Sequence, residues 1–209
     1  MLEALLTSKL PYKLGLTGSI GSGKSSILNI FASYGFPVYD ADRVVSEFYA
    51  GEAVPLIKEA FPESVQQDRL DKNVLWEIIR QDRAAWKRLE SIVHPFVFMR
   101  ADAFIAEEGS RKGCNLVVLD IPLLFECEKE NYVDAVLLVV ARQEVRRARV
   151  LLRPGMTEDK FRDISAHQFP AWRKRLLADF VIDTSDLSME EVRQEVDRII
   201  LKIHQRIQA

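Results

Sequence analysis

The stretch that decides the fold of this 209-residue chain is Gly18-Ser19-Ile20-Gly21-Ser22-Gly23-Lys24-Ser25, which matches G-x-x-x-x-G-K-[ST] at every fixed position. Glycines let the backbone curl until successive N–H groups point inward at phosphate oxygens. Lys24 is expected to reach the β- and γ-phosphates of a nucleotide, and the Ser25 hydroxyl to hold Mg²⁺. The pattern predicts a nucleotide site whose binding residues are Gly18, Gly21, Ser22, Gly23, Lys24 and Ser25.

The flanks of this stretch have the structure that a phosphate loop requires. Lys13–Thr17 is short and mostly apolar, which predicts a strand. After the loop, Ile27, Ile30, Phe31 and Tyr34 recur at helical spacing and predict an amphipathic helix. A glycine-rich turn with an unrelated lysine does not account for a strand and a helix placed on either side.

Further along the chain, apolar runs and helical patterns alternate. Strands are expected at 36–39, 115–119, 135–140 and 180–183. Two of these runs are continuously apolar, which is typical of strands covered on both faces. The box Ser188-Met189-Glu190-Glu191 predicts the start of the last helix. The fold class is therefore α/β, a P-loop NTPase core with a parallel sheet covered by helices on both faces.

The chain is expected to form a single domain over residues 12–207. Its core is assigned to 12–42, 114–141 and 179–207, with a helical acceptor subdomain inserted at 43–113. Within that subdomain, Pro95 is expected at the first turn of a helix. A helical lid is expected at 142–178. This segment contains ten Lys or Arg but only four Asp or Glu, and Pro154-Gly155 separates its two predicted helices. Most of these basic residues are expected to be solvated.

The composition of the chain indicates which classes of binding partner to expect. A net charge of -2 and a pI near 6.0 argue against a dedicated nucleic-acid binder. No apolar run reaches the roughly 20 residues of a membrane span, and residues 1–12 lack the features of a secretory signal. Cys114 and Cys127 form no metal-ligand pattern and are expected to be thiols. We expect a cytoplasmic protein with a small-molecule partner and neither a nucleic-acid nor a membrane partner.

Carboxylates indicate which reaction the nucleotide serves. No Asn-Lys-x-Asp string for guanine is present, and the chain is short for a motor, so a small-metabolite kinase is favoured. Asp40 and Asp42 end a predicted strand, where one of them can orient and deprotonate an acceptor hydroxyl; the alternative is a helix N-cap. Asp120 follows an apolar run as a Walker B aspartate does and is a Mg²⁺ ligand or, equally, a loop cap.

Taken together, the strings LTGSIGSGKSS, PVYDAD, LESIVHP, VVLDIPLLFE and LADFVID resemble, in this order, those of dephospho-CoA kinases. The resemblance covers residues 13–200. It implies ATP-dependent phosphorylation of the ribose 3′-hydroxyl of dephospho-coenzyme A, the last step of coenzyme A biosynthesis. The implied fold is a P-loop core with a helical CoA domain and a lid.

The resemblance also implies roles for residues. It extends the nucleotide loop to Ser26 and makes Asp42 the catalytic aspartate. It places His94, which taken alone is better explained by a structural role, in the acceptor-binding part. Pro122, Leu123 and Phe125 of the PLLFE string would lie beside the acceptor, as would Asp40. Arg149 and Arg153 would be the lid arginines that neutralise charge during transfer, together with Lys24.

This sequence departs from the family pattern at several places. Ser19 stands where a second glycine is common, Val45-Ser46 where an alanine–arginine pair is usual, Lys72 ends an LDR-like triplet, and Thr184 ends a VIDN-like string. Two alternatives therefore stay open: another nucleoside-type small-metabolite kinase, or a CoA- or nucleotide-binding regulator without catalysis. The presence of Lys24, Ser25 and Asp42 argues against the second.

Overall fold

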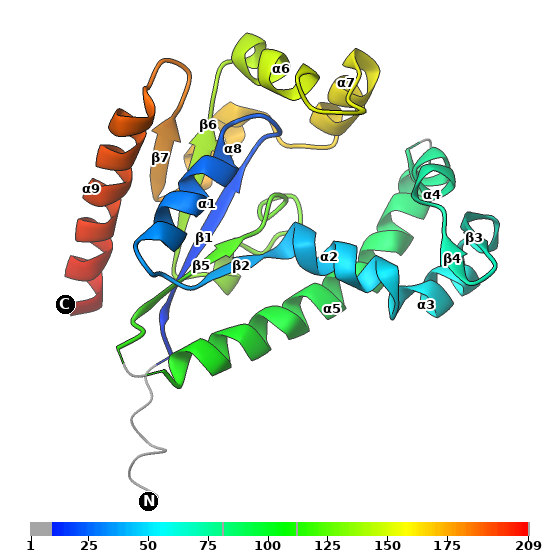
Figure 1. Ribbon diagram of the computed structural model, residues 1–209, viewed down its shortest axis with the longest axis horizontal. Helices are drawn as coiled ribbons and strands as arrows, with labels where there is room; N and C mark the ends of the chain where they lie inside the picture. Colours follow the sequence, from blue (N-terminus) through cyan, green and yellow to red (C-terminus); the bar gives the residue numbers. More distant parts are fainter. Residues whose placement is uncertain (1–9, 81, 112, 209) are drawn as a thin grey trace, which may run out of the picture. The chain divides into compact units, whose positions relative to one another are not determined.

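The strand that precedes the phosphate loop is the centre of a five-stranded sheet in the computed structural model, which describes residues 10–80, 82–111 and 113–208 (Figure 1). The strand order is β2-β5-β1-β6-β7. The bounds are β1 Tyr12–Gly18, β2 Val38–Asp40, β5 Leu116–Asp120, β6 Ala135–Val140 and β7 Phe180–Asp183. The pairs β1–β5, β1–β6 and β6–β7 are parallel. The expected α/β fold is confirmed, and so are all five strands, of which β2 is shorter than expected.

Two helices cover one face of this sheet. Helix α1 (Lys24–Ser33) and helix α9 (Met189–Gln208) pack side by side there (Figure 1). Their inward residues share one core with the strands, among them Ile27, Phe31, Val196 and Ile203. The capping box is confirmed, because Ser188 N–H and Oγ donate to Glu191 Oε2 at 2.8 and 2.7 Å. The expected inward position of Tyr34 is wrong: the helix ends before it, and its side chain is exposed.

The segment after β6 forms three helices in place of a simple helical pair. They are α6 (Gln143–Leu151), α7 (Glu158–Ala166) and α8 (Ala171–Leu177). The break at Pro154-Gly155 is confirmed, and Thr157 caps the start of α7, because its Oγ1 accepts the Lys160 N–H at 3.3 Å. Helix α8 packs against β6 on the side of the sheet away from α1 (Figure 1). A 3₁₀ turn, η3 (Glu130–Tyr132), lies between β5 and β6.

The described residues divide into two compact units, the first up to Tyr39 and from Ile105 onward, the second Asp40–Phe104. The second contains α2 (Ala41–Ala50), α3 (Ala53–Ala60), η2 (Pro62–Ser64), α4 (Lys72–Ile79) and most of α5 (Arg83–Gly109). It also holds a two-stranded hairpin, β3 (Val65–Gln66) with β4 (Arg69–Leu70). Its turn residues Gln67 and Asp68 have positive φ angles of 48° and 55°, which suit a tight hairpin.

Pro95 lies inside α5, so the expectation of a new helix starting there is wrong. A proline costs about 3 kcal/mol inside a helix because it removes a hydrogen bond and crowds the preceding turn. Buried apolar side chains recur every four residues along α5, namely Leu89, Val93, Val97 and Ala101. Each buried aliphatic side chain contributes up to about 1.5–3 kcal/mol. The buried stripe therefore outweighs the proline and keeps the helix continuous.

The expectation of no secretory signal in residues 1–12 falls mainly on residues 1–9, which lie outside the described residues. No helix among the described residues is both long and apolar enough to cross a bilayer.

Candidate active site

The phosphate loop connects β1 to α1 and has the backbone that its glycines allow. Gly21 and Gly23 have φ angles of 78° and 92°, a region that side chains disfavour. A Cβ on Gly21 would lie 2.6 Å from the carbonyl oxygen of Arg146 in α6. No side chain caps the start of α1, so the first N–H groups of that helix face the loop. This arrangement suits an anion at the positive end of the helix dipole.

Lys24 and Asp120 form an ion pair at the mouth of this loop. Asp120 is the last residue of β5, beside β1, and Lys24 Nζ donates to both of its carboxylate oxygens. Their side chains are only 14% and 6% exposed. The structure therefore brings together two residues that the sequence assigned separately to phosphate and to metal.

Residues far along the chain hold the outside of the loop. The Ile20 N–H donates to Gln168 Oε1 at 2.9 Å, and the Thr184 hydroxyl donates to the Ser22 carbonyl at 2.7 Å. The sequence pattern does not reveal Gln168, and it marks Thr184 only as a departure from a family string. No local pattern reveals these contacts, since the partners are 148 and 162 residues apart.

Arg149 lies in α6 and donates from Nη1 and Nη2 to the hydroxyl and carbonyl oxygens of Thr184 at 2.8 and 2.9 Å. Its Nη1 is also 3.5 Å from the carbonyl of Gly21. One of the two expected lid arginines therefore lies at the phosphate loop. The other, Arg153, follows the end of α6 and is exposed.

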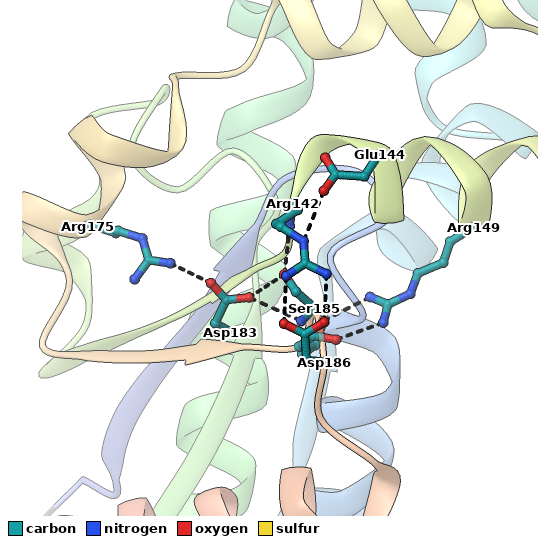
Figure 2. Close-up of polar contacts among 8 residues, drawn as sticks. Arg142, Glu144, Arg149, Arg175, Asp183, Ser185 and Asp186 are labelled. Atoms are coloured by element: carbon teal, nitrogen blue, oxygen red, sulfur yellow. Dashed lines mark hydrogen bonds and ion pairs between the residues drawn. The ribbon is translucent and has the colours of Figure 1, made fainter.

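Figure 2 shows three arginines at the end of β7 and the segment after it: Arg175 reaches Asp183, the last residue of the strand, while Arg142 and Arg149 reach the residues that follow. Arg142 makes two bonds of 2.6 Å to Asp186, which raise the pKa of the guanidinium and lower the pKa of the carboxyl. The backbone N–H of Arg142 donates to Ser185 Oγ at 2.8 Å. These contacts tie the start of α6 to the end of β7, so both elements are fixed beside the loop.

The candidate acceptor residues Asp40, Asp42 and His94 belong to the second unit. Asp40 caps α2, because its Oδ1 accepts the Arg43 N–H at 2.9 Å. Asp42 lies in the first turn of α2 and is exposed. His94 lies within α5, with its ring 6.4 Å from that of Phe98. The N-cap alternative is thus correct for Asp40, while the substrate roles of all three stay predictions.

The PLLFE string follows β5 in the first unit. The Pro122 carbonyl accepts the Thr17 hydroxyl at 2.9 Å, and Leu123 is half-buried. Phe125 is buried and lines a cavity of about 490 Å³ together with Phe169 and Leu176. The lining also includes Glu128, Glu130, Asn131 and Arg173, so the cavity is of mixed polarity, and a contact of the string with substrate stays a prediction.

The last residue of that string, Glu126, holds a buried lysine. Lys174 Nζ lies 2.7 Å from Glu126 Oε1, and the lysine side chain is fully buried. The two groups form a buried ion pair. Glu126 Oε1 also accepts the Phe169 N–H at 2.7 Å. The sequence pattern does not single out Lys174, since this residue stands in a basic, mostly exposed helix.

Oxygen donors at the loop fit a magnesium ion. Ser25 is exposed at the start of α1, and Asp120 supplies a carboxylate nearby in the fold. Among the described residues no cluster of three or more His, Cys, Asp or Glu forms a protein-only metal site. Mg²⁺ usually takes one or two protein oxygens and completes its shell with water and phosphates. The donor set thus fits a metal that arrives with a nucleotide.

Comparison with known proteins identifies the family. A family model described as dephospho-CoA kinase matches residues 12–190. A dephospho-CoA kinase of Mesorhizobium japonicum is 50% identical over 187 residues, which are 90% of this chain and 94% of that protein. The chain belongs to the dephospho-CoA kinase family.

Solved structures show the same fold. The structure of TT1252 from Thermus thermophilus has a TM-score of 0.81 and 34% identity, with 93% of this chain and 98% of that chain covered. A dephospho-CoA kinase from Campylobacter jejuni has a TM-score of 0.60 at 23% identity over 93% and 98% of the two chains, which supports the fold. As a member of the dephospho-CoA kinase family, the chain is a phosphotransferase with an alcohol acceptor, and the family expected from the sequence is confirmed.

Proposed function

We propose that this chain transfers the γ-phosphoryl group of ATP to the ribose 3′-hydroxyl of dephospho-CoA, giving coenzyme A in the last step of its synthesis. The observation that carries the proposal is the phosphate loop with Lys24 at the start of α1, in a chain whose residues 12–190 match the family. An inactive regulator is the less favoured alternative. The chain keeps Lys24, the Asp120 carboxylate beside it, and the loop backbone that phosphate binding needs.

ATP is held by the loop residues Gly18 to Ser26. Backbone N–H groups and the dipole of α1 bind the phosphate oxygens. Lys24 exchanges Asp120 for the β- and γ-phosphates, and Arg149, already beside the loop, and Arg153 neutralise charge on the transferred group.

Mg²⁺ would be held by Ser25 and Asp120 together with the nucleotide. When bound, the ion supplies positive charge to the phosphate oxygens. The protein contributes two further effects that do not depend on the metal: Lys24 adds a cation, and the buried wall of the loop limits competing water.

Asp42 is the base that orients the ribose hydroxyl and accepts its proton. Asp40 is less suited to this role, because its carboxylate already accepts a backbone N–H at the cap of α2. Asp42, the second residue of the helix, is exposed. We assign His94, Pro122, Leu123 and Phe125, with Asp40, to binding of the acceptor.

The same proposal assigns residues 43–113 to acceptor binding and 142–178 to a lid, with dephospho-CoA as the small-molecule partner and neither nucleic acid nor membrane. We place the reaction in the cytoplasm. The two cysteines, which form no disulfide with each other in the structure, are in keeping with a reducing compartment.

The direct test is an ADP-release assay with ATP and Mg²⁺ in which dephospho-CoA, adenosine and buffer are compared and the product mass is measured. One added phosphate on dephospho-CoA alone is the expected result. Transfer to adenosine instead would favour the nucleoside-type kinase, and ATP binding without any transfer would refute the proposal.

The base is tested by Asp42→Asn, with Glu47→Gln in the same helix as a control that removes the same charge. We expect Asp42→Asn to lower kcat by roughly 10²–10⁴-fold with unchanged ATP affinity. Glu47 is exposed and pairs only loosely with Arg43 at 3.9 Å, so its variant should differ little from the parent. Equal kcat in the two variants would remove Asp42 from the reaction.

A further inference from the structure

The residue after β7, Thr184, links three parts of the first unit. It is buried, and its N–H continues the sheet by donating to the Val140 carbonyl at 2.9 Å. A threonine hydroxyl has one proton to donate and two lone pairs that accept. Here the proton goes to the Ser22 carbonyl at 2.7 Å, and a lone pair accepts Arg149 Nη1 at 2.8 Å. The single hydroxyl therefore joins the phosphate loop to α6.

The contact with Ser22 fixes the direction of one peptide plane in the loop. In a trans peptide, the carbonyl of one residue and the N–H of the next point in opposite directions. Thr184 lies outside the loop and holds the Ser22 carbonyl toward itself. The N–H of Gly23 must then point to the opposite side, into the loop, where phosphate oxygens bind.

Gly23 shows how close this contact lies to the site. Its φ angle of 92° puts it in the left-handed region at the cap of α1. A Cβ placed there would lie 3.3 Å from Thr184 Oγ1 and 3.5 Å from Arg149 Nη1. The hydroxyl and the guanidinium thus back directly onto the residue whose N–H they orient.

The contact with Arg149 fixes a cation at the same place. Its planar fork donates to the hydroxyl and to the carbonyl of one residue, which holds the guanidinium at two points. Figure 2 shows this side chain reaching from α6 toward the segment that carries Ser185 and Asp186. The position of Arg149 therefore depends on Thr184 as well as on α6.

We propose that Thr184 is a positioning residue for the nucleotide: its hydroxyl holds the Ser22–Gly23 peptide so that the Gly23 N–H faces the phosphates, and it holds Arg149 beside them. The inference deepens the proposed function, on which it rests, and adds a residue outside the phosphate-loop motif to the nucleotide site. Thr184 itself does not touch the phosphates.

The test compares Thr184→Val, which keeps the shape and removes the hydroxyl, with Thr184→Ser, which restores it. Ser64→Ala is the matched control, because Ser64 is also buried and its hydroxyl also donates to a backbone carbonyl, that of Phe61 at 2.8 Å, in the second unit. Affinity for ATP is measured by titration calorimetry in the absence of acceptor. Thermal melting and steady-state kinetics of the same proteins complete the comparison.

We expect Thr184→Val to weaken ATP binding about tenfold, or about 1.4 kcal/mol, and to raise the KM for ATP more than it changes that for the acceptor. Thr184→Ser should bind within about twofold of the parent, and Ser64→Ala should melt lower but bind ATP as the parent does. If Thr184→Val fails to fold, Thr184→Ala carries the same expectation.

Three results would each overturn the inference while leaving the proposed function in place. These are an ATP affinity of Thr184→Val equal to that of the parent, a loss of ATP affinity in Ser64→Ala as large as that in Thr184→Val, and an ATP affinity of Thr184→Ser no better than that of Thr184→Val. If the parent protein itself bound no ATP, the proposed function would fail first.

Discussion

The buried pair of Lys174 and Glu126 makes a strong prediction about stability. The lysine side chain is fully buried and that of the glutamate 8% exposed, with Nζ 2.7 Å from Oε1. Removing one partner of such a pair leaves the other charge buried without a counter-ion, which costs roughly 3–5 kcal/mol. We therefore expect Lys174→Met to lower the free energy of unfolding by about 4 kcal/mol, a large part of the roughly 5–15 kcal/mol of a typical domain.

A second substitution separates the lost charge pair from the lost packing. In Lys174→Met/Glu126→Gln no charge is left buried, and the amide oxygen of glutamine can still accept the Phe169 N–H. Because a buried ion pair is often replaceable by neutral groups at little cost, the double variant should recover about 2 kcal/mol or more of the loss.

Urea unfolding followed by circular dichroism measures both values, and melting gives a check. For a chain of this size, about 4 kcal/mol corresponds to a fall in Tm of roughly 8–16 °C. A loss below about 1 kcal/mol in Lys174→Met, or a double variant as unstable as the sum of the two single ones, would refute the reasoning.

Three further predictions concern the loop and the last helix. Gly21→Ala should destabilise by roughly 2 kcal/mol more than Gly35→Ala, since both have positive φ but only the first Cβ meets backbone; equal melting shifts would contradict this. Asp120→Asn should bind metal-free ATP roughly tenfold more tightly, because Lys24 no longer pairs with a carboxylate, and it should need more Mg²⁺ for half-maximal activity. Calorimetry without Mg²⁺ tests the first change and activity measured against Mg²⁺ concentration the second; the absence of either would contradict the prediction. Hydrogen bonds from Ser188 lower the pKa of Glu191, so its contribution is present at neutral pH and lost as pH falls through that lowered value. Glu191→Gln should therefore melt below the parent at pH 7 but not in acid, whereas a Tm difference independent of pH would argue against the capping box.

The parts of the fold that the sequence predicted are those encoded by local pattern. The strands β6 and β7, the phosphate loop and the start of α9 follow from apolar runs, fixed glycines and a capping box, each read within a dozen residues. The prediction of a helix start at Pro95 is wrong because it uses only the local preference of proline. Whether the helix continues through Pro95 depends on the buried apolar stripe along the whole of α5.

The candidate site divides in the same way. Lys24 and Ser25 are read from the motif, but the ion pair of Lys24 with Asp120 joins residues 96 positions apart. Gln168, Thr184 and Lys174 make their contacts through tertiary packing, and nothing in their own neighbourhoods distinguishes them from ordinary polar residues. Side chains that brace a loop from outside are therefore beyond a reading of local pattern.

The ion pair of Lys24 with Asp120 has a consequence for which anions the loop admits. In this structure the charge of Asp120 balances that of Lys24, so Lys24 is not available to a bound anion until the carboxylate is displaced. An anion that binds to Lys24 must replace the Asp120 carboxylate, both oxygens of which already accept from Lys24 Nζ. A small monovalent anion provides less than that, whereas a polyphosphate brings several charged oxygens that the loop N–H groups bind at the same time. We therefore expect the pair to favour polyphosphates over small monovalent anions at this loop.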